Sequence, residues 1–189
     1  MKNIKLYTKE IINMAKRVAK FEKVTYGQFE KDWIDTFNVP ELDTATKREI
    51  ESIYEAINLP VRATKFSAGY DFASPLTFTL NSGETIKIPT GIRCGMNTDW
   101  VLMIYPRSGL GFKYQLSICN TIPVVDADYY FSNNEGHIFV KLVNRGDKSV
   151  HINLGDAFAQ GIFMEYGITE DDRVETSRNG GFGSTDKNK

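Results

Sequence analysis

The sequence lacks the features that define several protein classes. Its 189 residues include only two cysteines, Cys94 and Cys119, and two histidines. A disulfide framework and a zinc site of Cys and His ligands are therefore both disfavoured. No apolar run approaches the roughly 18 residues of a membrane span, and the N-terminus is too polar for a signal peptide. We expect a soluble, cytoplasmic protein with reduced thiols and no membrane association.

An excess of charge of either sign is also missing. The 23 Lys and Arg residues nearly balance 24 Asp and Glu residues, which leaves a net charge of −1. Proteins that coat nucleic acids normally carry a basic excess, so we expect no stable nucleic-acid binding. The motifs GxxxxGK[ST], HExxH and GxSxG are absent too, which disfavours the common nucleotide-loop, zinc-protease and serine-hydrolase classes. An apolar share of 41% still provides enough side chains for a folded core.

Glycine and proline are scarce in the first third of the chain. Before Pro60 there are only Gly27 and Pro40, whereas the other 14 glycines all follow it. This change of texture predicts two parts. Residues 1–58 read as a helical N-terminal extension, and residues 59–189 read as a β domain.

The N-terminal extension has apolar residues at helical spacing in three places. Thr25 with Gln28 forms a capping box ahead of the second set, and Pro60 stops the third. Three short helices cannot bury their apolar faces alone, so we expect a helical cap on the β domain; a surface for a protein partner is the alternative. The three sets are Ile11, Met14, Ala15 and Val18; Tyr26, Phe29, Trp33 and Phe37; and Ile50, Ile53, Tyr54 and Ile57.

The second part is a series of short strands. Residues 78–80 and 86–88 alternate around a turn at residues 81–83, which predicts a hairpin. Further strands are expected at residues 100–105, 137–143, 150–154 and 159–164. Many short strands between Gly, Pro and Asn turns indicate a mainly β fold, an antiparallel sandwich or barrel.

Five polar, glycine-rich stretches stand out between these strands. Arg107, Ser108 and Gly109 combine a guanidinium, a hydroxyl and an unobstructed N–H, which together can cradle an anion; the alternative is a turn capped by an ion pair. The five stretches are AGYD at 68–71, PRSG at 106–109, residues 120–129, GDAFAQ at 155–160 and RNGGFGST at 178–185.

The last two candidates concern a lid and a base. Arg178 and Ser184 can meet phosphate oxygens, and Phe182 among glycines is placed to stack on a planar group, unless this stretch is a disordered tail. Asp126 lies between apolar residues and can act as a general base toward water, unless it is an ordinary turn residue. The strand residue His137 is expected to pack or lie on the surface rather than to catalyse.

Taken together, the five stretches resemble in order and spacing the five motifs of the trimeric dUTPase (dUTP diphosphatase) family. The resemblance covers roughly Leu59 to Lys187. It implies a dUTPase-like β-barrel or jelly-roll subunit, a homotrimer with shared active sites and a C-terminal motif that closes over the nucleotide. It also implies hydrolysis of dUTP to dUMP and pyrophosphate, with Mg²⁺ bound by the triphosphate.

The resemblance also implies a role for each motif residue. Asp126 resembles the base that activates water, Tyr129 the tyrosine that packs on deoxyribose and excludes a 2′-hydroxyl, and Asp71 the aspartate that supports the water shell of the metal. The other substrate-binding residues that it implies are Arg107, Ser108, Gly109, Asn120, Val125, Gln160, Arg178, Phe182, Gly183 and Ser184.

Three features depart from the family pattern. Ala157 stands where the fourth motif usually has arginine, the loop at residues 130–135 is long, and residues 1–58 lie outside the family core. Three alternatives stay open: an enzyme related to dCTP deaminase, a regulatory protein that binds a partner on the dUTPase scaffold, and a non-catalytic jelly roll.

Overall fold

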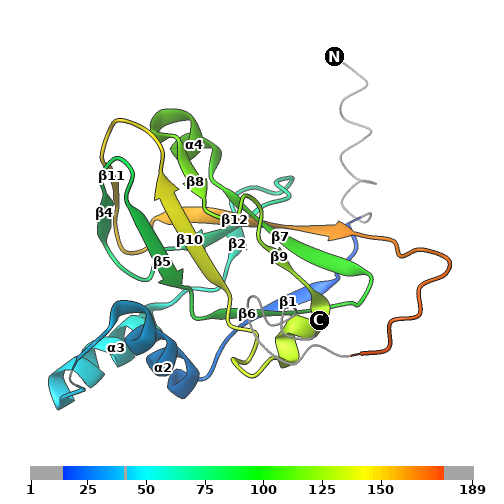
Figure 1. Ribbon diagram of the computed structural model, residues 1–189, viewed down its shortest axis with the longest axis horizontal. Coiled ribbons are helices and arrows are strands. Elements are labelled where there is room, and N and C mark those ends of the chain that lie inside the picture. Colours follow the sequence, from blue (N-terminus) through cyan, green and yellow to red (C-terminus); the bar gives the residue numbers. More distant parts are fainter. Residues whose placement is uncertain (1–14, 41, 177–189) are drawn as a thin grey trace.

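The computed structural model describes residues 15–40 and 42–176, and within them the fold is mainly β, as the sequence predicts (Figure 1). The helices are α2 (Tyr26–Phe37), α3 (Thr44–Ala56), α4 (Ser108–Tyr114) and the 3₁₀ turn η2 (Ala127–Phe131). The strands are β1 (Ala19–Lys23), β2 (Val61–Arg62), β3 (Tyr70–Ala73), β4 (Phe78–Leu80), β5 (Thr85–Pro89), β6 (Ile92–Met96), β7 (Trp100–Pro106), β8 (Leu116–Ile118), β9 (Val124–Val125), β10 (Phe139–Asn144), β11 (Val150–Ile152) and β12 (Ala157–Glu165).

The described strands pair in antiparallel fashion. The largest sheet has the order β2-β3-β12-β7-β9, and the smaller ones are β5-β10-β8, β4-β11 and β1-β6. Strand β12 lies between β3 and β7, with Gln160 opposite both Asp71 and Tyr105. This register brings the first, second and fourth polar stretches of the sequence to the same end of strands β3, β12 and β7.

Helices α2 and α3 pack on the β-sheets through one continuous core. Phe29 of α2 and Ile50 of α3 are buried in the same cluster as Phe72, Leu102 and Phe158 of the strands. The N-cap of α2 is formed as predicted, since the Thr25 hydroxyl accepts a hydrogen bond from the Gln28 N–H at 3.3 Å. The apolar faces of both helices are therefore used by the chain itself.

Strands β4 and β5 form where the sequence predicts them, but the expected hairpin is wrong. Strand β4 pairs with β11 and β5 pairs with β10. The turn between them is held by Asn144 instead: its carbonyl accepts from the Gly83 N–H at 2.8 Å, and its buried amide donates to the Leu80 carbonyl at 2.9 Å. The turn thus passes from one sheet to another rather than closing a ribbon.

The helix expected around residues 11–18 is only partly testable, because Ile11 and Met14 lie outside the described residues. Ala15 and Val18 are described and are not helical. They lead into strand β1, which pairs with β6. Strand geometry turns Phe21 inward, where its ring packs at 5.4–5.7 Å from the rings of three sheet residues, Tyr70, Phe72 and Phe163. In the described part of the chain, no helix has the length and apolar character to cross a membrane.

Candidate active site

Three of the predicted site residues meet near one end of the largest sheet. Asp71 lies on β3, Gln160 on β12 and Arg107 directly after β7. The Arg107 Nε lies 3.3 Å from Asp71 Oδ1, and the Gln160 side-chain amide donates to the Pro106 carbonyl at 3.2 Å. The ion pair is partly exposed, so it adds little stability and can exchange its partner for a ligand.

The turn from β7 into α4 completes this group. Arg107 is the N-cap of α4, and Ser108 and Gly109 form its exposed first turn. The first N–H groups of a helix have no partner within the helix, and they attract anions. A groove of about 310 Å³ runs along Pro106, Arg107, Ser108, Gly111 and Phe112. We call Asp71, Arg107, Ser108, Gly109 and Gln160 the Arg107 group.

A second group of predicted residues lies around β9 and η2. Val125 is buried on β9, Asp126 is the N-cap of η2, and Tyr129 is buried within η2. Asn120 is exposed in the turn before β9. We call Val125, Asp126 and Tyr129 the tyrosine group.

The two groups do not converge within one chain. Val125 pairs with Leu102, which precedes Arg107 by five residues of strand β7. At a rise of about 3.3 Å per residue, this separates them by roughly 16 Å. Figure 1 agrees, because α4 (green) lies near the top of that view and η2, the yellow-green helical turn, lies in its lower half. Within one chain, the two groups therefore lie apart.

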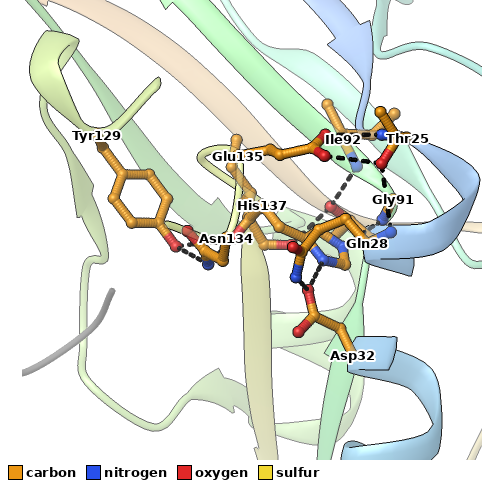
Figure 2. A network of polar contacts seen from close by, with 11 residues as sticks. Thr25, Gln28, Asp32, Gly91, Ile92, Tyr129, Asn134, Glu135 and His137 are labelled. Atoms are coloured by element: carbon orange, nitrogen blue, oxygen red, sulfur yellow. Dashed lines mark hydrogen bonds and ion pairs between the residues drawn. The ribbon is translucent and has the colours of Figure 1, made fainter. Parts of the chain in front are cut away.

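The side chain of Tyr129 is held by hydrogen bonds from the loop that follows it (Figure 2). Its hydroxyl donates to the backbone carbonyl of His137 at 2.8 Å and accepts from the Asn134 amide at 2.8 Å. His137 is fully buried, so of the two expected placements, in the core or on the surface, the structure shows the first. The tyrosine is therefore positioned before any ligand arrives.

The environment of this network includes an acidic residue of α2. Asp32 contacts the His137 ring, with Oδ2 and Nδ1 2.6 Å apart. Burial raises the pKa of the Asp32 carboxyl, but hydrogen bonds from His137 and Gln28 outweigh it and hold the pKa below its usual range. The sequence reasoning missed Asp32, because an acidic residue on a helix gives no signal of a partner that lies 105 residues away.

The predicted residues of the last motif, Arg178, Phe182, Gly183 and Ser184, lie outside the described residues. Ala157, at the position of the missing arginine, is half-buried on β12 beside a bulge where the pairing with β3 shifts register.

A family model described as dUTPase matches residues 55–186. The chain belongs to the dUTPase family. The deoxyuridine 5′-triphosphate nucleotidohydrolase of Lactococcus lactis subsp. lactis is 40% identical over 132 residues, which are 68% of this chain and 88% of that protein. The protein of the same name from Haemophilus influenzae is 35% identical over 137 residues, 68% of this chain and 87% of that protein.

Solved dUTPases have the same fold. The dUTPase of Streptococcus mutans superimposes with a TM-score of 0.57 at 29% identity, covering 79% of this chain and 98% of that one. The dUTPase of Staphylococcus bacteriophage 80alpha gives 0.58 at 18% identity over 85% of this chain and 90% of that one, a likeness of fold. The family match starts at residue 55, so α2 and most of α3 lie outside it.

A magnesium ion fits the Arg107 group only if it binds together with the triphosphate of a nucleotide. Among residues 15–40 and 42–176, no three His, Cys, Asp or Glu side chains gather where they could hold a metal. A hard cation would therefore take most of its oxygen ligands from phosphates and water. Asp71 on β3, the single carboxylate in the Arg107 group, fits a contact with the water ligands of such an ion.

Proposed function

We propose that this chain is a dUTP diphosphatase, which hydrolyses dUTP to dUMP and pyrophosphate in the cytoplasm and so limits uracil in DNA while supplying dUMP for thymidylate synthesis. The observation that carries the proposal is the Arg107 group. Asp71, Arg107 and Gln160 come from distant parts of the sequence and meet near one end of the largest sheet, in a chain of this family. Residues 59–189 would provide this chemistry, with residues 1–58 as an accessory segment.

The chemistry asked of the protein is positioning and charge neutralisation, as in phosphoryl transfer generally. Arg107, Ser108 and the N–H of Gly109 would bind phosphate oxygens, with Gln160 beside them. Asp126 would take a proton from the attacking water, whose oxygen bonds to phosphorus as the pyrophosphate leaves. Arg178 and Ser184 would add contacts to the phosphates from the last motif.

Selectivity for the nucleoside would come from the tyrosine group. Tyr129 would pack on the deoxyribose and leave no space for a 2′-hydroxyl, and Asn120 and Val125 would help to place the uracil. Phe182 would cover the base, and Gly183 would let the backbone approach the nucleotide.

Magnesium would be held by the triphosphate and, through water, by Asp71, where it supplies further neutralisation of phosphate charge. A solved phage phi11 dUTPase is described as having a structural Mg(II) ion, which supports a metal in this family.

Separation of the two groups within one chain favours a homotrimer with shared active sites. Phe112 beside the Arg107 group is 93% exposed, and Phe131 beside the tyrosine group is 81% exposed. Large exposed apolar side chains next to both halves of the site are typical of surfaces that another copy covers.

The test is pyrophosphate release from dUTP, dTTP, dCTP and UTP side by side, with and without Mg²⁺. We expect strong preference for dUTP, because a site built for the edge of uracil leaves buried groups unpaired when it holds cytosine. Ammonia release from dCTP would favour the deaminase instead. Comparable turnover of UTP would contradict the role of Tyr129.

A further inference from the structure

His137 links the N-terminal extension to the tyrosine group, because its ring contacts Asp32 of α2 and its backbone carbonyl contacts Tyr129 (Figure 2). Its Nε2 accepts a hydrogen bond from the Gly91 N–H at 2.8 Å. Because a backbone N–H can only donate, the proton of the neutral ring is on Nδ1, which donates to Asp32 Oδ2 at 2.6 Å. The backbone carbonyl of the same residue accepts the Tyr129 hydroxyl.

A second link joins the loop at residues 130–135 to the start of α2. One carboxylate oxygen of Glu135 accepts from the Thr25 N–H at 2.8 Å, and the other accepts from the Thr25 hydroxyl at 2.7 Å. A carboxylate at a helix N-terminus is stabilised by the helix dipole and by otherwise unpaired N–H groups. Glu135 therefore fastens the end of the loop to the helix cap.

A third link fastens the residue after Tyr129. The Tyr130 hydroxyl donates to Glu22 Oε2 of β1 at 2.6 Å, and the Arg93 guanidinium lies 4.2 Å above the Tyr130 ring while pairing with the same carboxylate. Residues of the extension thus contact both η2 itself and the loop that follows it.

The loop closes tightly on η2. Gly136 has a φ of +71°, and a Cβ there would lie 2.8 Å from both the Tyr129 carbonyl oxygen and the Tyr130 Cα. A displacement at residues 135–137 is therefore passed directly to the backbone of Tyr129, because close-packed contacts leave no slack.

We propose that β1 and α2 of the N-terminal extension are a brace that positions Tyr129 for sugar discrimination, with Asp32 and His137 as positioning residues. The proposal rests on the function proposed above. It also relates two departures from the family pattern: the extension and the long loop bind each other, through Glu135 to Thr25 and through Tyr130 to Glu22.

The experiment compares Asp32→Ala with Asp32→Asn in the full chain. Alanine removes the acceptor for His137, whereas the asparagine oxygen can still accept from both His137 and Gln28. The exposed Asp35→Ala on the same helix is the matched control for loss of a carboxylate. Glu135→Ala tests the second link independently and serves if Asp32→Ala fails to fold.

Two readouts are used. The first is the ratio of kcat/KM for dUTP to that for UTP, which we expect Asp32→Ala to narrow roughly 10-fold, because small misplacements of a positioning group cost rates of this order or more. We expect Asp32→Asn and Asp35→Ala to stay within about 2-fold of the parent ratio. The second is hydrogen–deuterium exchange of residues 127–137 without nucleotide, which should rise in Asp32→Ala and Glu135→Ala alone.

An unchanged dUTP/UTP ratio, or unchanged exchange at residues 127–137 in a folded Asp32→Ala protein, would overturn the brace. A loss of kcat for both nucleotides in equal proportion would also overturn it, since that outcome reflects general damage. If the parent protein does not hydrolyse dUTP, the proposed function fails, and the exchange measurement then decides the brace by itself.

Discussion

The Arg107 group and the tyrosine group differ in how far the fold fixes their side chains before a ligand binds. Arg107 and Ser108 are partly or fully exposed and face a groove, and the ion pair of Arg107 with Asp71 is weakened by solvent. Tyr129 is buried and hydrogen-bonded to a loop that the N-terminal extension holds. Groups that neutralise charge can be left to the ligand to arrange, whereas a group that discriminates by shape must be in place beforehand.

The largest expected effect comes from one substitution in each group, Asp126→Asn and Arg107→Ala, tested separately and in mixed trimers. Asp126→Asn should lower kcat roughly 10²–10⁴-fold with binding of a non-hydrolysable dUTP analogue largely kept, because the shape stays and the base is lost. Arg107→Ala should lower activity through weaker phosphate binding. If the sites are shared, trimers assembled from a 1:1 mixture of the two variants should regain about a quarter of the parent activity, since about one site in four receives both intact groups.

Pyrophosphate release from co-refolded mixtures measures this effect, with each variant refolded alone as the control. Mixtures that stay as inactive as the separate variants would show that each chain uses its own Asp126 and Arg107. That result would contradict the separation along β7 as an argument for a shared site.

The next effect concerns the last motif. Deleting residues 178–189 removes Arg178 and Phe182 and the segment expected to exclude water, so we expect hydrolysis of dUTP to fall roughly 10-fold or more. The melting temperature should stay near that of the parent, because the deletion takes away only one large apolar side chain. Deletion of residues 187–189 alone is the control. A truncated protein that no longer folds would make Phe182 a core residue.

The places of the candidate residues at strand ends and turns were predictable, because they depend on local sequence. Arg107, Ser108 and Gly109 follow an apolar strand directly, and Asp126 and Tyr129 lie within one short turn, so strand ends and turns locate them. The pairing of β4 with β11 was not predictable, because the two strands lie far apart in the sequence, with Leu80 opposite Val150. The contact of Asp32 with His137 could not be predicted for the same reason, since the two residues are 105 positions apart. Helical spacing shows which face of a helix is apolar, but not which of its polar residues contacts a loop.

A backbone change should loosen the tyrosine group selectively. In Gly136→Ala the new Cβ would press on the backbone of Tyr129 and Tyr130 at a φ of +71°. We expect the free energy of unfolding to fall by roughly 1–3 kcal/mol, as for other strained positions. Gly27→Ala in α2, where a Cβ meets nothing within 4 Å, should instead gain about 0.5–1 kcal/mol. Urea unfolding at one fixed protein concentration compares them. Equal effects of the two substitutions would mean that the loop yields freely.

The smallest effect tests how Glu22 holds the residue after Tyr129. Hydrogen bonds from Lys20 and then Tyr130 lower the pKa of the Glu22 carboxyl from 4.5 to about 2. A carboxyl with a lowered pKa stabilises the folded state above its unfolded pKa, and this contribution is lost as the pH falls from about 4.5 toward 2. Glu22→Gln removes the titration. Between about pH 5 and pH 3, the melting temperature of the parent should therefore fall more than that of Glu22→Gln, by roughly 2–4 °C.

Glu165→Gln is the control for this change, because Glu165 also pairs with a lysine but on the open surface, where its side chain is 54% exposed. Loss of so exposed a pair should alter the acid dependence little. If Glu22→Gln and Glu165→Gln change the fall in melting temperature between about pH 5 and pH 3 equally, Glu22 contributes only surface charge. The link to Tyr130 then does not hold η2. If only Glu22→Gln reduces the fall in melting temperature with falling pH, the contacts of Glu22 with Lys20, Arg93 and Tyr130 stabilise the folded state.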